Sequence, residues 1–197
     1  MAASPLYRTL LLMRHAKSSW DNPAWTDHDR PLNDRGDHDA PKMAEVLRDL
    51  GLTPTHIVSS TANRAKTTAQ KVADAIGFTG DIVLEPRLYL ATPSDWHHVV
   101  KQLPDMHETV LCVGHNPGLE QLLQKWSGED IEMPTAAIAI VDVTATPWSD
   151  FDRHGLTVTD VLRPKEVCAR PGAGVPPSGG SVPIRVGTSA NVFIAEV

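Results

Sequence analysis

The chain has 197 residues, a length that predicts one domain with a single well-filled hydrophobic core. Its 18 lysine and arginine residues stand against 24 aspartate and glutamate residues, which gives a formal net charge of -6 at pH 7. This balance excludes a broad basic surface for nucleic acid or for an anionic membrane, so we expect a few local cations to bind any anionic substrate.

The amino terminus and the cysteines indicate where the protein works. Residues 1–9 lack the basic start and the apolar core of an export signal, and no segment approaches the ~18 apolar residues of a membrane span. Cys112 lies in an apolar run and Cys168 in a polar segment, a pair that matches neither a disulfide framework nor a metal motif. The sequence therefore predicts a soluble protein of the reducing cytoplasm, with no membrane or nucleic-acid partner.

An apolar run from Leu10 to Met13 predicts a first strand that is covered on both faces, as in a parallel sheet. The strand ends in Arg14 and His15, and the small Ala16 permits a tight turn directly afterwards. Ligands bind at the carboxyl ends of strands in open α/β sheets, where a guanidinium beside an imidazole offers an anion fork next to a nucleophile. Taken alone, however, such a pair more often marks a strand that ends in two solvated side chains.

A long polar segment over 17–34 follows this strand. Two prolines argue against a helix there, so we expect a loop over the carboxyl edge of the sheet, which is either functional or a mobile surface excursion. The loop carries Asp21, Asp27, His28, Asp29 and Arg30. Apolar residues at helical spacing then predict a helix over 37–50 that ends at Gly51.

A second strand is predicted over 56–60. Thr61 is the expected cap of the helix that follows over 62–76, which Gly77 ends. Arg64 therefore lies in the first turn of that helix, close to the carboxyl end of the second strand.

A third strand is predicted over 81–84, and it leads into a loop that begins with Glu85. Ser94 or Asp95 is the expected cap of the next helix, which runs to about residue 103. The chain between the third strand and the fourth is short, so it leaves no room for a large lid.

The fourth strand is predicted over 109–113, and His115 follows its end. Asn116-Pro117 marks the start of another helix, because proline is favoured in a first helical turn. Two closing strands are predicted over 136–143 and 156–162, and the absence of a helix of similar length between them favours an antiparallel hairpin.

These elements predict an α/β fold: a three-layer sandwich with a mostly parallel central sheet, helices on both faces and an antiparallel edge. We expect the domain to cover residues 1–165. Residues 166–197 are rich in proline, glycine and serine and offer little apolar surface, so we expect a flexible tail.

The cationic residues after three strands form the candidate site. Arg14 and His15 follow the first strand, Arg64 follows the second and His115 follows the fourth. Parallel strands joined by crossovers bring these ends to one edge of the sheet, where two guanidinium forks, two imidazoles and a helix amino terminus suit a tetrahedral dianion such as a phosphoryl group. Each residue alone has a structural explanation, but three such explanations together are less economical than one site.

Four separated motifs of the chain resemble the histidine phosphatase superfamily, in particular its short SixA-like branch of phosphohistidine phosphatases, and they occur in that family's order. The motifs are Leu12-Met13-Arg14-His15-Ala16, Arg30-Pro31-Leu32 with Arg35-Gly36, residues 58–69, and Val113-Gly114-His115-Asn116-Pro117. The resemblance spans residues 8 to about 164 and implies a phosphoglycerate mutase-like fold. At Ala16 many members carry glycine, and a small residue still meets the steric need.

The resemblance implies that His15 is the nucleophile and carries the phosphoryl group as a phosphohistidine. Arg14, Arg64 and His115 would clamp the phosphoryl oxygens, and Arg30 is a further substrate-binding candidate. His15 must be unprotonated at one nitrogen to attack. Because two guanidinium groups oppose its protonation, we expect a lowered pKa for His15.

The general acid is left open. Asp27 matches the position before Arg-Pro-Leu where the short branch carries its candidate acid, whereas Glu85 follows the third strand where mutase-like members place theirs. Asp21 and Asp29 are weaker candidates. A phosphorylated imidazole leaves easily once its other nitrogen is protonated, so this chemistry permits a modest acid.

The sequence thus predicts a metal-independent and cofactor-independent phosphatase. Protein phosphohistidine is the first expected substrate, and small phosphomonoesters are the second; a mutase-like enzyme is the runner-up. A non-catalytic phosphate-binding protein is the alternative of another class, although it would typically have lost the nucleophile. A metal site at Asp27-His28-Asp29 or at His97-His98 is disfavoured, because both patterns are weak. The oligomeric state stays open.

Overall fold

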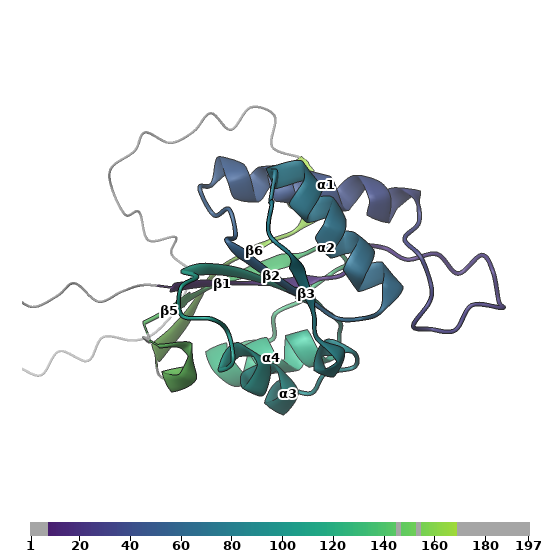
Figure 1. The fold of residues 1–197 in the computed structure, drawn as a ribbon. Helices are drawn as coiled ribbons and strands as arrows, with labels where there is room; N and C mark the ends of the chain where they lie inside the picture. The colour runs from purple at the N-terminus through teal and green to yellow at the C-terminus, as the bar shows by residue number, and fades with distance from the viewer. Residues whose placement is uncertain (1–7, 145–146, 153–154, 169–197) are drawn as a thin grey trace, which may run out of the picture.

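A six-stranded sheet forms the middle layer of the computed structural model, which describes residues 8–144, 147–152 and 155–168 (Figure 1). The strands lie in the order β3-β2-β4-β1-β5-β6. Their bounds are Arg8–Arg14 (β1), His56–Ser59 (β2), Ile82–Leu84 (β3), Thr109–Gly114 (β4), Ile138–Val143 (β5) and Leu156–Leu162 (β6). The first four strands pair in parallel, whereas β5 pairs antiparallel with both β1 and β6. The predicted mixed sheet with an antiparallel edge is confirmed.

Helices cover both faces of this sheet (Figure 1). On one face lie α1 (Asp34–Asp49) and α2 (Asn63–Ile76), and on the other lie α3 (Pro93–Val100) and α4 (Gly118–Ser127). Two short 3-10 turns, η1 (Pro86–Leu88) and η2 (Trp148–Asp150), and the helix α5 (Pro164–Cys168) complete the described chain. None of the described helices is long and apolar enough to cross a membrane.

Strand β1 lies in the interior of the sheet and is covered by both helical layers. Leu10 and Leu12 are fully buried in the core that includes residues of α3 and α4. Leu11 and Met13 point the other way and are fully buried in the core with residues of α1 and α2. Alternation along one strand therefore fills both cores, which explains why this segment is apolar at every position rather than at every second one.

Helix caps are the elements on which the sequence predictions were wrong. Helix α2 begins at Asn63 after Ala62, which supplies no side-chain cap; the predicted cap, Thr61, accepts or donates a bond with the His28 ring instead. Helix α3 is capped by Thr92, not by Ser94 or Asp95, although the Asp95 carboxylate completes the capping box by accepting from the Thr92 backbone. The local residue types permit several caps, and the surrounding loops select one.

Helix α1 begins three residues earlier than predicted, with Asn33 as its cap. The helix starts there because its first turn packs on the segment that follows β1: a Cβ atom at Gly36 would lie 2.2 Å from the Lys17 carbonyl oxygen. Only glycine permits this approach. The loop between β1 and α1 is therefore tied at its base, where Ser18 and Leu32 also form an isolated antiparallel bridge.

The closing hairpin starts two residues later than predicted. Ala136 has a left-handed backbone (φ 62°), which delays β5 until Ile138, and its N–H donates to the carbonyls of Arg14 and His15. At the other end, α5 continues to Cys168, and Val167, two residues past the predicted boundary at residue 165, packs against the core. The remainder of the predicted tail, residues 169–197, lies outside the described residues.

Candidate active site

Four residues from three strand ends meet at the carboxyl edge of the sheet. Arg14 ends β1, and His15 continues its pairing because its N–H donates to the Gly114 carbonyl (3.0 Å). Arg64 lies in the first turn of α2 and His115 directly follows β4, as predicted. They line a pocket of about 440 Å³, which is also lined by Lys17, Ser18, Trp20, Asp27, Arg30, Tyr89, Leu90, Asn116 and Thr135.

One ring nitrogen of His15 is unprotonated, and its lone pair faces the pocket. Its Nδ1 lies 2.7 Å from the Ala16 carbonyl oxygen, which can only accept, so Nδ1 carries the proton. Nε2 is therefore unprotonated, and it accepts from Nε of Arg64 at 3.2 Å. Thr68 supports this turn from below, since its hydroxyl accepts from the Ala16 N–H. The nitrogen suited to attack faces a guanidinium group.

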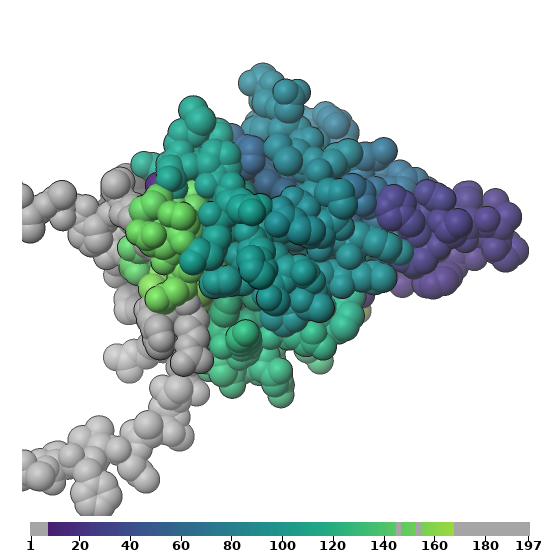
Figure 2. All heavy atoms as spheres, turned by 60° about the horizontal axis from the view of Figure 1, so that its bottom comes forward, coloured from purple at the N-terminus to yellow at the C-terminus, as the bar shows by residue number. Residues whose placement is uncertain are grey.

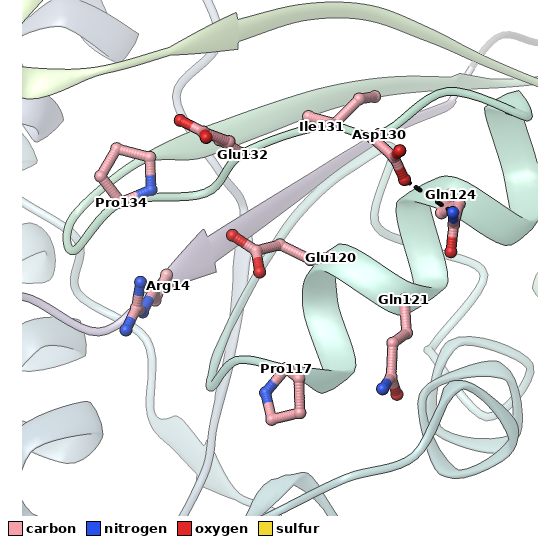
Figure 3. A pocket seen from close by; sticks show the side chains of 9 residues that line it. All are labelled: Arg14, Pro117, Glu120, Gln121, Gln124, Asp130, Ile131, Glu132 and Pro134. Atoms are coloured by element: carbon pink, nitrogen blue, oxygen red, sulfur yellow. Dashed lines mark hydrogen bonds between the residues drawn. The ribbon is translucent and has the colours of Figure 1, made fainter.

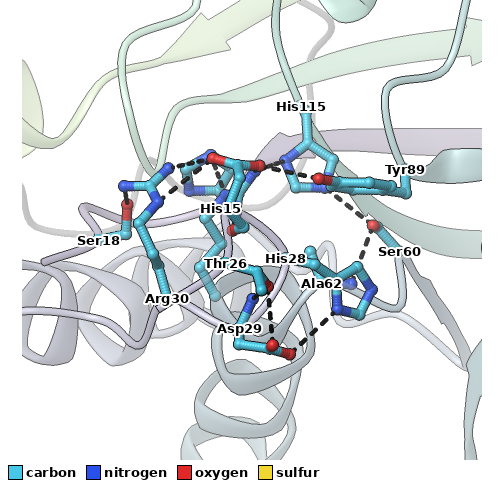
Figure 4. A network of polar contacts seen from close by, with 12 residues as sticks. His15, Ser18, Thr26, His28, Asp29, Arg30, Ser60, Ala62, Tyr89 and His115 are labelled. Atoms are coloured by element: carbon cyan, nitrogen blue, oxygen red, sulfur yellow. Dashed lines mark hydrogen bonds and ion pairs between the residues drawn. The ribbon is translucent and has the colours of Figure 1, made fainter. Parts of the chain in front are cut away.

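His115 has the opposite tautomer. An Arg64 terminal nitrogen lies 3.3 Å from its Nδ1 and can only donate, so this nitrogen carries the lone pair. Nε2 then carries the proton and donates to the Ser60 hydroxyl at 2.8 Å (Figure 4). The two imidazole rings lie 5.0 Å apart between centroids and are tilted by 54°. Arg64 thus joins both histidines through their unprotonated nitrogens.

Burial is the main reason that both histidines are neutral. Desolvation of the charged ring lowers the pKa of His15 to about 3, and the positive charges of Arg64 and Arg14 lower it further. The pKa of His115 is also lowered to about 3, again by burial first and then by His15 and Arg64. The predicted direction for His15 is therefore present, but the two guanidinium groups are a smaller cause than the loss of water.

The Asp27 carboxylate pairs with the Arg64 guanidinium, at the donors that would otherwise bind an anionic ligand. Its Oδ2 lies 2.9 Å from an Arg64 terminal nitrogen, and its backbone carbonyl accepts from the other. Oδ1 accepts from Arg30 at 2.8 Å, and the Tyr89 hydroxyl donates to Oδ2 at 2.9 Å. Burial opposes ionisation of Asp27 most strongly, yet the bonds from Arg30, Tyr89 and Arg64 together lower its pKa to about 2. Asp27 is a carboxylate in this arrangement.

The remaining cations are fixed by the loop and by the chain before β5. Arg14 donates to the Met133 carbonyl at 2.8 Å, and its Nε is buried without a hydrogen-bond partner in the described chain. Arg30 is almost completely buried, donates to the Ser18 hydroxyl at 2.9 Å and lies 3.6 Å below the centroid of the Trp20 ring. Arg30 therefore fixes Asp27 and the loop, and its guanidinium does not form a separate binding site for an anion.

Three other sequence candidates lie away from the pocket. Glu85, the alternative acid, pairs with Arg87 at 2.8 Å, and the hydrogen bond from Arg87 is the main cause of its lowered pKa. The Asp21 carboxylate accepts from the Ser19 hydroxyl, and Asp29 bonds to Thr26 at the loop surface. None of the three is among the residues that line the His15 pocket.

One further expectation, that the amino terminus of α2 faces the phosphoryl group, is changed by the structure. The amino terminus of α2 is covered by the loop, because the Asn63 N–H donates to the His28 carbonyl at 2.9 Å, so it does not present this donor to a phosphoryl group. Among the described residues, no group of three His, Cys, Asp or Glu is placed to hold a metal ion, and this includes those near Asp27-His28-Asp29 and His97-His98.

Several pocket residues escaped the sequence analysis. Tyr89 stands edge-on to His115 at 5.6 Å between centroids and also bonds to Asp27, and Ser60 fixes the His115 tautomer (Figure 4). Trp20, Leu90 and Thr135 line the pocket mouth. A tyrosine or leucine in a loop carries no local signal, and the only available clue was its position after a strand of a parallel sheet.

A second hollow of about 450 Å³ adjoins the first, and Arg14 lines both. Its walls come from the start of α4 and the chain before β5, and they carry Glu120, Asp130 and Glu132 (Figure 3). Glu120 accepts from the Met133 N–H at 2.9 Å and Asp130 accepts from Gln124 at 2.6 Å. These carboxylates are thus partly engaged within the fold.

Known proteins resemble this chain in sequence and in fold. Residues 10–97 match the model of the histidine phosphatase superfamily (branch 1). The chain is 35% identical over 162 residues to an uncharacterized chloroplastic protein of Arabidopsis thaliana, covering 76% of this chain and 74% of that protein. It is 39% identical over 79 residues to a protein of Enterobacter sp. provisionally named phosphoglycerate mutase GpmB, covering 39% of this chain and 35% of that protein.

A solved structure extends the likeness over most of the chain. The protein of Agrobacterium tumefaciens with the provisional name phosphohistidine phosphatase SixA is 30% identical, with a TM-score of 0.66, and covers 79% of this chain and 98% of its own. The chain belongs to the histidine phosphatase superfamily. Within it, the fold is that of the SixA-like and phosphoglycerate mutase-like proteins, and the similarity supports a phosphatase or mutase enzyme.

Proposed function

We propose that the protein is a phosphatase that transfers a phosphoryl group to Nε2 of His15 and then to water, with protein phosphohistidine as its substrate. The observation that carries this proposal is the His15 ring: Nδ1 is held by the Ala16 carbonyl, and the Nε2 lone pair points at Arg64. A neutral, oriented nucleophile beside a guanidinium group is the arrangement that in-line attack on phosphorus requires.

In the first step, a bond forms between Nε2 of His15 and phosphorus while the bond from phosphorus to the leaving atom breaks. Arg64 turns its donor from Nε2 to a phosphoryl oxygen, and Arg14 stabilises another. In the second step, water attacks phosphorus, the bond to Nε2 breaks, and inorganic phosphate leaves; the proton of the attacking water passes to the Asp27 carboxylate, which releases it to solvent when it pairs with Arg64 again. The electron pair of the broken bond returns to Nε2, so His15 is restored.

Asp27 has two roles in this scheme. In the resting site its carboxylate occupies Arg64, so an incoming phosphoryl dianion competes with Asp27 for the same donors. Once displaced from Arg64, Asp27 loses a charge-assisted bond that holds its pKa low, so its carboxylate can take up a proton from the monoanionic form of the incoming phosphoryl group and pass it to the leaving group. A phosphorylated imidazole needs less help than an alkoxide, which favours phosphohistidine as the substrate.

The shape of the site supports a substrate presented by a protein. Between β3 and β4 the chain forms only η1 and α3, and it builds no large lid over the His15 pocket. A mutase must retain its intermediate between two transfers, which an open pocket does not favour. Small phosphomonoesters are the second substrate class, and the partial likeness to the Enterobacter protein keeps a mutase-like reaction as the alternative.

Two guanidinium groups supply the positive charge that a metal ion provides in many phosphatases, so the proposed reaction uses no metal. We expect the rate to be unchanged by EDTA. Complete loss of activity that returns with a divalent cation would contradict this part of the proposal.

Trapping the phosphoenzyme tests the function directly. Brief exposure to labelled phosphoramidate, followed by a denaturing quench, is expected to leave acid-labile and alkali-stable label on the peptide that contains residue 15. His15→Ala should carry no label, whereas His107→Ala, at the other end of the sheet, should be labelled normally. Label that persists in His15→Ala would contradict the assignment of the nucleophile.

A further inference from the structure

We propose that Trp20 and Leu90 form an apolar rim at the mouth of the His15 pocket, which grips the protein chain that carries the phosphohistidine. This inference rests on the proposed function and adds the residues that select the substrate. Both side chains line the pocket and both are largely exposed, Trp20 at 71% and Leu90 at 64%. They come from different parts of the chain, the loop before α1 and the turn before α3.

Trp20 is held in place without being covered. One face of its ring lies on the Arg30 guanidinium at 3.6 Å, and Arg30 is itself fixed by Asp27 and Ser18. The segment that carries it protrudes from the body of the protein (Figure 2) but is tied at its base, where the Ser19 N–H donates to the Pro31 carbonyl. A large aromatic surface is therefore presented to solvent beside the pocket in a fixed orientation.

Leu90 is held in a backbone conformation that its side chain disfavours. Its φ angle is 55°, which is rare for a leucine. Leu88, two residues before it, and Ala91, directly after it, are buried, and α4 packs so closely on this turn that a Cβ atom at Gly118 would lie 1.9 Å from the Ala91 carbonyl oxygen. The fold thus maintains strain in order to place an apolar side chain at the pocket mouth, and such strain concentrates at functional sites.

A protein chain is the occupant that this rim fits best. A sugar phosphate or another small polar phosphoester gains little from exposed tryptophan and leucine side chains, whereas a protein chain can bury them. Trp20 and Leu90 line the same pocket as His15 and Arg64, so a chain that inserts its phosphorylated side chain comes within reach of this rim. Burial of exposed apolar side chains, tryptophan above all, is the usual source of affinity in protein recognition.

Two substrates distinguish binding at the rim from the phosphoryl transfer step. We would measure kcat and KM for phosphoramidate, which carries no protein, and for a small protein phosphorylated on a surface histidine. Trp20→Ala and Leu90→Ala are each expected to raise KM for the phosphoprotein about tenfold, with kcat unchanged and with both constants for phosphoramidate unchanged.

Matched controls are available in the same chain. Trp25→Ala removes a second exposed tryptophan of the same loop, and Leu84→Ala removes an exposed leucine of β3; neither lines the pocket. Both controls should behave as the wild type with either substrate. Thermal midpoints of all four variants, measured alongside, should show that each remains folded.

Three results would overturn the proposal. Equal loss on both substrates in Trp20→Ala would show that Trp20 acts through Arg30 on the chemistry, and an unchanged KM for the phosphoprotein would show that the rim makes no contact. Wild-type protein that forms the His15 phosphoenzyme from phosphoramidate but fails to hydrolyse the phosphoprotein would remove the protein substrate while leaving the proposed chemistry intact.

Discussion

The two ends of the central sheet carry the same residue types but differ in what those residues contact. At the carboxyl edge lie Arg14 and the pair of rings formed by His15 and His115. At the amino edge lie Arg8 and a second ring pair, His56 and His107, stacked at 4.7 Å with 18° between the planes.

The amino edge neutralises its cation within the fold. Arg8 donates to the carbonyls of Asp105 and His107, both at 2.9 Å, lies 3.7 Å from the Asp105 carboxylate and stands over the Trp148 ring. At the carboxyl edge, by contrast, two arginines, Arg30 and Arg64, share a single carboxylate, that of Asp27. Uncompensated positive charge at strand carboxyl ends, rather than arginine and histidine as such, distinguishes the site.

Loss of Arg64 should produce the largest difference in catalytic rate between the two edges. We expect Arg64→Ala to lower kcat by about 10²–10³-fold, because this guanidinium serves His15, His115 and the phosphoryl group together. Steady-state kinetics with phosphoramidate would measure it, with Arg8→Ala as the control that keeps wild-type kcat. A variant with normal kcat and only a raised KM would show that Arg64 binds the ground state alone.

For stability the order of the two edges should be reversed: the arginine at the amino edge, Arg8, should matter more than Arg14 at the carboxyl edge. Arg8→Ala is expected to lower the free energy of unfolding by about 2 kcal/mol, since two carbonyls lose a charged donor and Asp105 loses its partner. Arg14→Ala loses one bond to Met133 and the attraction of Glu120, but it also removes the cost of burying this charge and the repulsion from Arg64, so we expect a change within about 1 kcal/mol. Urea unfolding would measure both, and a larger loss in Arg14→Ala would reverse the comparison.

The sequence predicted the carboxyl edge because its signals are local. An apolar run that ends in Arg14-His15, an arginine in a first helical turn and a histidine after a buried strand are each readable in a few residues. Parallel topology then brings them together without any knowledge of side-chain packing. The same logic predicted the parallel pairing of the first four strands and the antiparallel closing hairpin.

What the sequence could not predict depends on contacts between distant segments. The hydroxyl of Tyr89 reaches Asp27 across 62 residues, and Ser60 sets the tautomer of His115 across 55. Neither residue type at its position distinguishes a site from a surface. The ranking of causes for the His15 pKa also needed the fold, because burial is a property of the packed structure and not of the neighbouring charges.

Acid should destabilise the protein through the ring pair at the carboxyl edge. An unfolded histidine has a pKa near 6.5, whereas the folded values for His15 and His115 are about 3. Between pH 6.5 and pH 5 the unfolded chain therefore binds protons that the folded chain does not, so the free energy of unfolding falls as pH falls, by about 1.4 kcal/mol per pH unit for each histidine.

Replacement of either histidine tests this dependence. His15→Asn and His115→Asn should each remove about 1.4 kcal/mol per pH unit from the slope in that window. Urea unfolding at several pH values would measure the slope, with the exposed His38→Asn as the control. A slope that stays as steep in both site variants would place the proton uptake elsewhere, for example at the stacked pair of the amino edge.

The expected effect of changing Asp27 is the smallest, but it is the most specific. The single substitution Asp27→Asn should strengthen the binding of phosphate and slow the hydrolysis of substrates with poor leaving groups. In Asp27→Asn the competing negative charge leaves Arg64, so we expect inorganic phosphate to inhibit at about tenfold lower concentration. Asp29→Asn changes a carboxylate of the same loop that bonds to Thr26, and it should leave phosphate inhibition unaltered. Weaker inhibition in Asp27→Asn would show that the carboxylate helps to build the anion site rather than occupying it.

The rate of hydrolysis by the same variant should depend more steeply on the pKa of the leaving group than that of the wild type. If displaced Asp27 donates the proton, Asp27→Asn slows hydrolysis of alkyl phosphates far more than that of phosphohistidine or nitrophenyl phosphate, which depart with little protonation. Glu85→Gln should be mild, because Glu85 is paired with Arg87 outside the pocket. A steep new dependence in Glu85→Gln with none in Asp27→Asn would move the acid to the turn after β3 and favour the mutase-like alternative. Flat behaviour in both would leave water or His115 as the source of the proton, and Asp27 would then act only as the anion that the phosphoryl group displaces.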